Sequence, residues 1–509
     1  MIFNKNLGFF SSNLDNYIEQ INKGDDRYLS LIFCVFAEDS AKHKSRAAQV
    51  LNEVFNEFSF DDLYRIDAQM RETTSMESSI NWSALNIKHF ITEQMSVDEK
   101  RAVFIFASFN PNGYIREQAV EALTAYKETL AFILLRCNDW VYQVRQSALL
   151  FLSKSLVNAS DEEIVNALPL MEKLRRSGRC EYNNILSIIA SVFESNKSLI
   201  NKGLRSQDMR ARRFCISFLN NMPKIEFKYL LNYIRYEKDP FLRKMIFQIL
   251  LKANSDIKEL SKQFLKDKYP PNRILALQYL YDNKVETVFY EAERMLMDRN
   301  AQVRTLARSI VLQTERQFDI RQCYLDNLST STAISLYGLG EVGFHEDCNL
   351  VEEFLSGNCN EVVRAAMTVL MRLDSATFVF RITEMLSSEH SGIVKTATLL
   401  LKKYKEYDFE RIFQIQENSS NENTKIKCAS LLFLSPKWKS LIYTLMLIGS
   451  GYEKLEILCQ TQLNRWVFSY NRSFAVLSEN EKREIKELLI GKKRFIKPET
   501  IKEILFLSK

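Results

Sequence analysis

A short pattern recurs about every thirty residues along this chain, and it constrains the fold more than any other feature. A small polar residue is followed five positions later by an apolar residue and then at once by arginine or lysine, as in Asp298, Val303 and Arg304. Apolar residues on helical spacing continue the same copy: Leu306, Ala307, Ile310 and Val311. Such spacing places the apolar side chains on one face of a helix.

The basic residue of the pattern marks each copy. These residues are Arg116, Arg145, Arg212, Arg243, Arg273, Arg304, Arg364, Lys395 and Lys427. Successive copies lie 29 to 32 residues apart, except for two gaps of 67 and 60 residues, each about twice the period. We therefore expect one degenerate copy in each gap, at 182–189 and at 333–340, where Gly338 replaces the usual alanine. Self-similarity at this period is typical of stacked helix pairs.

Two stretches carry a resemblance to a known family. Residues 139–148 and 298–307 share the order Asp-x-x-x-x-Val-Arg-x-x-Ala, and residues 337–343 precede a further Val-Arg-Ala-Ala at 363–366. The pattern resembles the HEAT-repeat family, particularly the HEAT-like repeats of phycobilisome lyases. The resemblance implies that each repeat is an antiparallel helix pair, and that the pairs form an α-α superhelix.

The same resemblance implies a role for the recurring polar residues. In HEAT proteins the aspartate and arginine lie inside the stack and tie neighbouring repeats together. On this basis the expected structural ladder consists of Asp139, Arg145, Asp267, Arg273, Asp298, Arg304 and Arg364. Ser206 and Asn358 occupy the aspartate position in two copies, so the ladder is in doubt there.

Composition supports an all-α chain with three regions. Only 13 glycines and 8 prolines occur in 509 residues, and runs of alternating valine and threonine are missing, which argues against a substantial sheet. We expect an irregular helical N-terminal cap at 1–100, regular repeats at 101–435 and a helical C-terminal cap at 436–509. Terminal repeats of solenoids are commonly atypical because one face meets water.

Cysteine usage and hydropathy favour a cytoplasmic protein. Nine cysteines are scattered without a Cys-x-x-Cys pair, which is typical of reduced residues in the cytosol. The longest apolar run, at 441–448, is far shorter than a membrane span. We therefore expect a soluble chain with no membrane span.

Positive charge gathers in the middle of the chain. Residues 171–280 contain 22 lysines and arginines against 10 aspartates and glutamates, whereas the whole chain has a net charge of only +6. Basic residues outside the repeat pattern make a candidate binding patch: Arg175, Arg176, Arg179, Arg205, Arg210, Arg213 and Lys244. Such a patch could bind an acidic protein, nucleic acid or lipid headgroups.

No catalytic or metal-binding motif stands out. The chain has no phosphate-binding glycine loop, no Gly-x-Ser-x-Gly and no His-Glu-x-x-His. The nearest candidate metal group, His345, Cys348, Cys359 and His390, lacks two tight ligand pairs, so we expect no metal and no cofactor. DNA glycosylase and bilin lyase activities are disfavoured because no residues match their sites.

Two functional hypotheses remain. The first is a non-catalytic solenoid scaffold, an accessory or adaptor subunit whose partner is another protein. Exposed side chains of the second helices are its expected contacts, among them Gln146, Lys244, Arg308 and Arg372. The alternative is a nucleic-acid-binding protein of the DNA-repair type that uses residues 171–280.

Overall fold

The described part of the chain is entirely helical. The computed structural model describes residues 9–56, 60–73, 80–196, 198–221, 227–253, 256–469 and 475–508. In these ranges every regular element is a helix and no strand occurs, which confirms the all-α fold class. Contacts divide the chain into two compact units, Met1–Asp256 and Ile257–Lys509.

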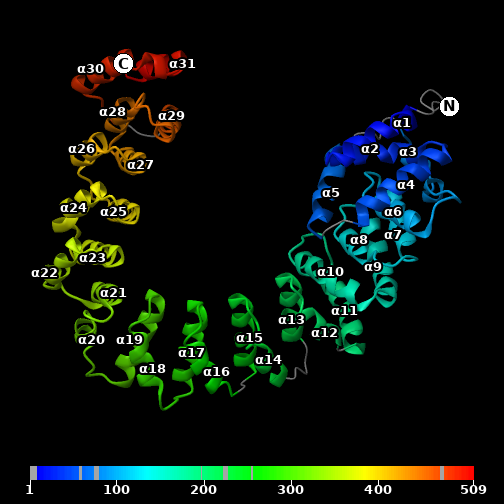
Figure 1. Ribbon diagram of the computed structural model, residues 1–509, viewed down its shortest axis with the longest axis horizontal. Coiled ribbons are helices and arrows are strands. Elements are labelled where there is room, and N and C mark those ends of the chain that lie inside the picture. Colours follow the sequence, from blue (N-terminus) through cyan, green and yellow to red (C-terminus); the bar gives the residue numbers. More distant parts are fainter. Residues whose placement is uncertain are drawn as a thin grey trace. The chain divides into compact units, whose positions relative to one another are not determined.

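The first unit begins with short helices and continues as helix pairs (Figure 1). Its α-helices are α1 (Phe9–Ser12), α2 (Leu14–Asn22), α3 (Leu29–Ala37), α4 (Ala41–Asn56), α5 (Phe60–Thr73), α6 (Val97–Ala107), α7 (Gly113–Leu123), α8 (Leu130–Arg136), α9 (Tyr142–Asn158), α10 (Asp161–Leu174), α11 (Tyr182–Ser195), α12 (Ser198–Leu204), α13 (Met209–Asn221), α14 (Phe227–Tyr233) and α15 (Pro240–Lys252). Short 3₁₀ turns are η1 (Asp26–Tyr28), η3 (Trp82–Ala84) and η4 (Ile87–Phe90).

The second unit consists of helix pairs followed by two terminal helices. Its α-helices are α16 (Lys258–Phe264), α17 (Pro270–Asp282), α18 (Val288–Met295), α19 (Ala301–Thr314), α20 (Ile320–Asp326), α21 (Thr332–Val342), α22 (Asp347–Glu352), α23 (Asn360–Leu373), α24 (Ser375–Glu384), α25 (Ser391–Tyr404), α26 (Phe409–Asn418), α27 (Glu422–Leu432), α28 (Lys437–Leu447), α29 (Glu453–Phe468), α30 (Glu479–Gly491) and α31 (Pro498–Leu507). Its 3₁₀ turns are η5 (Glu353–Ser356), η6 (Met385–Ser387) and η8 (Lys493–Phe495).

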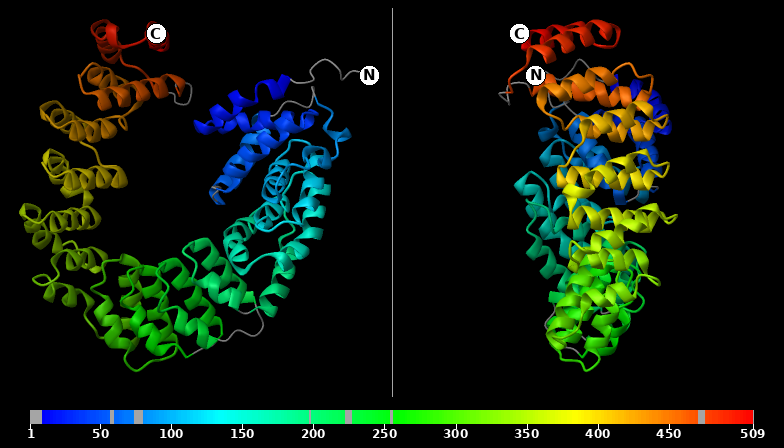
Figure 2. Two further views of the ribbon diagram at one scale, coloured as in Figure 1. Left: turned by 45° about the vertical axis from the view of Figure 1, so that its right-hand side comes forward. Right: turned by 90° about the vertical axis from the view of Figure 1, so that its left-hand side faces the viewer.

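Many of the pairs pack against the next through their second helices. In the first unit α9 contacts both α7 and α11, and in the second unit α25 contacts both α23 and α27. Within the second unit, the right-hand view of Figure 2 shows the yellow and orange helices in successive layers. Stacking neighbours in this way buries one continuous core. The helix pairs confirm the HEAT-like solenoid architecture that the sequence predicts.

Capping side chains fix where the second helices begin. Asn112 starts α7, Asp239 starts α15, Asn300 starts α19 and Asn421 starts α27, and each side chain accepts hydrogen bonds from backbone N–H groups of the first turn. These bonds satisfy donors that the helix itself leaves unpaired. Each of these four second helices therefore begins directly after an asparagine or aspartate of the preceding turn.

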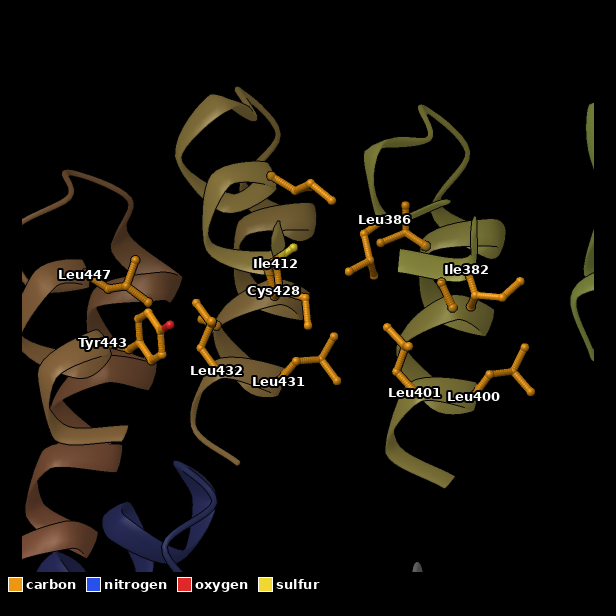
Figure 3. Close-up of a cluster of buried hydrophobic side chains, with 14 of the residues drawn as sticks. Ile382, Leu386, Leu400, Leu401, Ile412, Cys428, Leu431, Leu432, Tyr443 and Leu447 are labelled. Atoms are coloured by element: carbon orange, nitrogen blue, oxygen red, sulfur yellow. The ribbon is translucent and has the colours of Figure 1, made fainter. Parts of the chain in front are cut away.

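The core of the second unit is a layer of aliphatic side chains between pairs. Leu400 and Leu401 of α25 and Leu431 and Leu432 of α27 lie in neighbouring layers, with Tyr443 of α28 beyond them (Figure 3). All five are buried. Because each layer contacts only its neighbours, the unit lengthens without needing a larger core.

The expected division into three regions, with boundaries near 100 and 435, stays a prediction. The first compact unit ends at 256 and the second begins at 257, inside the expected repeat region. Residues 1–8, 57–59 and 74–79 of the expected N-terminal cap lie outside the described residues.

Among the helices that are described, none combines the length and the apolar character that crossing a bilayer requires.

Candidate functional site

The repeated arginines fold back onto the turn that precedes their own helix. The Nη1 of Arg273 donates to the carbonyl of Asp267 at 2.7 Å, and the Nη1 of Arg304 donates to that of Asp298 at 2.7 Å. Arg145 reaches the carbonyl of Asp139 in the same way at 2.7 Å. Each arginine therefore bonds the residue six positions earlier, which leaves its Nε and Nη2 edge directed away from the turn.

In the second unit this edge joins consecutive pairs. The Nε and Nη2 of Arg273 donate to the two carboxylate oxygens of Asp298 at 2.7 and 2.6 Å. Asp298 also accepts the backbone N–H of Asn300 at 2.8 Å. Arg304 uses the same edge on Glu341 of α21, which Arg308 contacts as well. Bidentate pairing fixes both distance and orientation between neighbouring repeats.

The first unit contains a more deeply buried version. The Nε and Nη2 of Arg116 donate to Asp139 at 2.9 and 2.8 Å, and Nη1 of Arg136 donates to it at 2.9 Å. Burial acts to raise the pKa of Asp139, but hydrogen bonds from Arg116 and the charges of both arginines outweigh it, so the pKa lies below its ordinary value. A second rung joins Arg212 to Glu237 at 3.0 and 3.2 Å.

Two expected ladder arginines do not form the expected ion pair among the described residues. Arg145 has no carboxylate partner within the described ranges, because the next repeat is the degenerate copy at 182–189. Arg364 donates through Nε to the carbonyl of Asn360 in its own helix, and the described chain offers it no ion pair either. The carboxylate of Asp267 accepts the N–H of Tyr269 at 2.8 Å, and its pairing in the ladder stays a prediction.

Beyond α21 the basic positions of the pattern turn outward. Lys395 is exposed, and Lys427 is partly exposed. The buried lysine of that repeat is instead Lys425, whose Nζ donates to the carbonyl of Gln416 at 2.7 Å. The sequence pattern therefore continues after the internal ladder has ended.

Carboxylates offset part of the basic patch of the first unit. Arg175 and Arg213 both contact the buried Glu172, at 2.7 and 3.1 Å. Arg210 pairs with Asp208 at 2.9 Å. The four remaining members have no ion pair with any residue that the structure describes: Arg176, Arg179, Arg205 and Lys244. The patch is therefore less positive than the charge count of this segment implies.

A small pocket lies on the second helices beside this patch. It has a volume of about 270 Å³ and is formed by α11, α13 and α15. Arg175 and Lys252 contribute charge, while Asn220, Asn221 and Gln248 contribute amide groups. Its described lining residues include no carboxylate and no histidine, so it holds no arrangement of an acid, a base and a nucleophile.

The helix α9 is apolar on two faces. Val144, Ala148 and Leu152 are buried against neighbouring helices. On the other side, Leu150 is 70% exposed and Val157 is 80% exposed. Tyr142, at 58% exposure, lies on the same outward stripe, which we call the α9 face (Tyr142, Gln146, Leu150 and Val157).

Aromatic side chains extend this surface at the start of the helix. Trp140 and Tyr114 are both more than half exposed. The guanidinium of Arg145, which lacks a carboxylate among the described residues, lies 5.5 Å from the ring centre of Tyr142. Of the α9 face, only Gln146 is among the contacts expected from the sequence. Its apolar members had a signal in the sequence, because the helix carries apolar residues beyond the stripe that packs inside.

The histidines and cysteines do not assemble a metal site in the part of the chain that the structure describes. The Nε2 of His345 pairs with Asp374 at 2.9 Å instead. Cys348 is buried and Cys359 is exposed. All nine cysteines are unpaired.

Comparison with known proteins gives matches of fold only. No family model and no curated protein matches the chain. The chain resembles importin beta at 12% identity and a TM-score of 0.35, over 94% of this chain and 74% of that one. It resembles Kap95p, from a structure of Kap95p binding to RanGDP, at 11% identity and a TM-score of 0.37, over 94% and 73%. Kap121p matches at 11% identity and a TM-score of 0.34, over 92% and 63%.

Proposed function

We propose that this chain is a non-catalytic scaffold, an accessory or adaptor subunit that binds another protein through the first unit. The observation that supports this function is the α9 face, where Leu150 and Val157 are left uncovered on a helix whose opposite side is already packed. Apolar side chains that become fully buried contribute about 1.5–3 kcal/mol each, which favours a partner that covers them. Neighbouring exposed aromatic residues add the side-chain types that are enriched in protein interfaces.

The alternative partner, nucleic acid, has weaker support. Arg116, Arg212 and Arg273 each hold a carboxylate and a backbone carbonyl, so the regular stripe of arginines is directed into the stack. Phosphate binding would depend on the unpaired members of the basic patch, chiefly Arg176 and Arg205. Such binding would weaken steeply with salt.

The compartment and the absence of catalysis are part of the same proposal. Nine unpaired cysteines fit a reducing environment, so we place the scaffold in the cytoplasm. Burial raises the pKa of Cys34 and of Cys428 to about 12, so these thiols do not act as nucleophiles at neutral pH. We assign the chain no reaction, cofactor or metal.

The test is capture of partners from the native cell with a matched pair of variants. Leu150→Glu combined with Val157→Glu places two charges on the α9 face, whereas Asn158→Glu places one on another side of the same helix. We expect the double variant to lose a protein that the wild type and Asn158→Glu both retain. Circular dichroism checks that the helical content of each variant is unchanged.

Identical protein sets from all three forms would contradict the proposal. A gel-shift titration over a range of salt concentrations tests the alternative, using Arg176→Glu with Arg205→Glu. Binding with a steep salt dependence that these changes abolish would favour nucleic acid.

A further inference from the structure

The second unit contains a larger pocket lined by positive charge. It has a volume of about 600 Å³ and lies among α25, α27, α28 and α29. Its cations come from separate parts of the chain: Lys402 from α25, Lys437 from the start of α28 and Arg465 from α29. We call it the cationic pocket. Within the described residues no carboxylate lines it.

Two cations of the pocket, Lys402 and Arg465, have no carboxylate partner among the described residues. The Nζ of Lys402 donates to the hydroxyl of Ser430 at 3.0 Å, a neutral partner. Arg465 forms no ion pair with any described residue. Burial and the nearby charge of Lys427 lower the pKa of Lys402, and burial lowers that of Lys437. An anion that enters the pocket would stabilise the charged form of Lys402, which burial disfavours.

The surrounding hydroxyl groups do not supply further donors. The hydroxyl of Ser435 donates to the carbonyl of Leu432 at 2.7 Å, and that of Thr461 donates to Ile457 at 2.8 Å. Ser440 is engaged in the same way. The donors that we assign to a ligand are therefore those of Lys402 and Arg465.

Apolar side chains border the same pocket. Leu434 is 50% exposed at its lining, and Leu458 lies beside it. Trp466 forms a wall but is only 6% exposed, and its indole N–H donates to the carbonyl of Lys437 at 2.9 Å. A ligand that fills this volume needs an anionic group and an adjoining apolar group.

We propose that the cationic pocket binds a phosphorylated serine or threonine in a segment of a protein partner. A phosphoryl group carries a charge of about −1.5 to −2 on three acceptor oxygens, which matches several cations around one pocket better than a single carboxylate does. Arginine binds such a group through two parallel hydrogen bonds, a geometry available to Arg465. The apolar border near Leu434 takes the side chain next to the phosphorylated residue.

Nucleic acid and membrane fit the pocket less well. Single-stranded nucleic acid binds by stacking bases on exposed aromatic rings, and the ring of Trp466 is covered. Anionic membranes attract clusters of basic residues at a surface, whereas these cations line a recess between helices. The pocket therefore favours one compact dianion carried on a flexible chain.

The experiment measures peptide binding to the full-length chain by fluorescence anisotropy. The probes are three fluorescein-labelled peptide libraries with leucine beside a central position that holds phosphoserine, serine or glutamate. We expect the phosphoserine library to bind at least about tenfold more tightly than the other two. Unlabelled inorganic phosphate should compete, but only at far higher concentration than the peptide.

Variants locate the binding in the pocket. Lys402→Gln and Arg465→Gln should each weaken phosphopeptide binding by about tenfold, and Arg465→Lys should weaken it by about threefold because lysine cannot form the paired hydrogen bonds. Lys395→Gln removes a charge from the same helix α25 outside the pocket and should change the affinity by less than about twofold.

Several results would overturn the proposal. They are equal binding of the three libraries, insensitivity to Lys402→Gln and Arg465→Gln, or binding confined to an RNA oligonucleotide or to vesicles containing a phosphoinositide. The proposal rests on the proposed function only in that the ligand is a segment of a protein. If partner capture depends on the α9 face but the chain shows no preference for phosphopeptide, the proposal for the cationic pocket is wrong and the scaffold function is still supported.

Discussion

Removing the charge of Asp139 should destabilise the first unit strongly. The side chain of Asp139 is 0% exposed, and its partners Arg116 and Arg136 are 2% and 0% exposed. The substitution Asp139→Asn keeps the shape but leaves two guanidinium groups next to a neutral amide. Breaking a buried ion pair by removing one partner costs about 3–5 kcal/mol, because the remaining charge stays out of water.

Other contacts soften this effect without removing it. Arg116 retains the carbonyls of Asn110 and Pro111, both at 2.8 Å, and Arg136 retains Asp67. We therefore expect a loss of about 3 kcal/mol, the lower end of the range for a broken buried pair. Typical domains have a total free energy of unfolding of about 5–15 kcal/mol, so the loss should be easily measured.

Urea unfolding followed by circular dichroism measures the loss, and hydrogen exchange locates it in α7, α8 and α9. The control is Asp25→Asn, which removes an ion pair with Arg27 that lies on the surface. Exposed pairs contribute about 0–1 kcal/mol, so the control should shift the unfolding midpoint little. Equal shifts for the two variants, or faster exchange spread evenly over the unit, would refute the reasoning.

Three further predictions concern pH, packing and thiol reactivity. The pKa of Asp139 is lowered by folding, so its stabilisation is complete above the unfolded value of about 3.9 and is lost as the pH falls through the folded value; acid unfolding of Asp139→Asn should lack this contribution. Gly338→Ala should destabilise the second unit by about 1–3 kcal/mol in urea unfolding, since the new Cβ would overlap the buried ring of Tyr324, and Tyr324→Leu should reduce that penalty. Cys359 is exposed, so a thiol reagent such as Ellman's reagent should modify it first in the folded chain, and Cys359→Ser should remove the fastest phase.

Local features of the fold could be predicted from sequence because their chemistry lies within a few residues. The sequence Ser-Glu-Asn-Glu at 478–481 predicts a capping box, and in the structure Ser478 and Glu481 bond each other's backbone N–H groups. Proline directly after Lys497 predicts the start of a last helix, which runs over Pro498–Leu507. Both signals depend on neighbours in sequence, so one chain suffices to read them.

The candidate surfaces could not be predicted, because they depend on pairing between distant residues. A count of charges includes Arg213 but cannot show that Glu172, 41 positions earlier, lies against it. Likewise, Lys402 and Arg465 belong to helices that are not consecutive, and their meeting depends on how α25, α27 and α29 stack. The repeat pattern predicts that the helix pairs stack, but it does not predict which residues of neighbouring pairs face one another.

The missing rung at Arg145 has a mechanical consequence for the first unit. Where a guanidinium pairs with the carboxylate of the following helix pair, the bidentate contact opposes sliding and rotation of one helix pair against the other. Between α9 and α11 that clamp is absent from the described contacts. Apolar packing and a hydrogen bond from Nε2 of Gln146 to Glu181 at 3.0 Å oppose a change of angle there. Rotation between α9 and α11 therefore meets less resistance than rotation between α7 and α9, where Arg116 pairs with Asp139. A partner bound to the α9 face can change the angle between these helix pairs at little energetic cost.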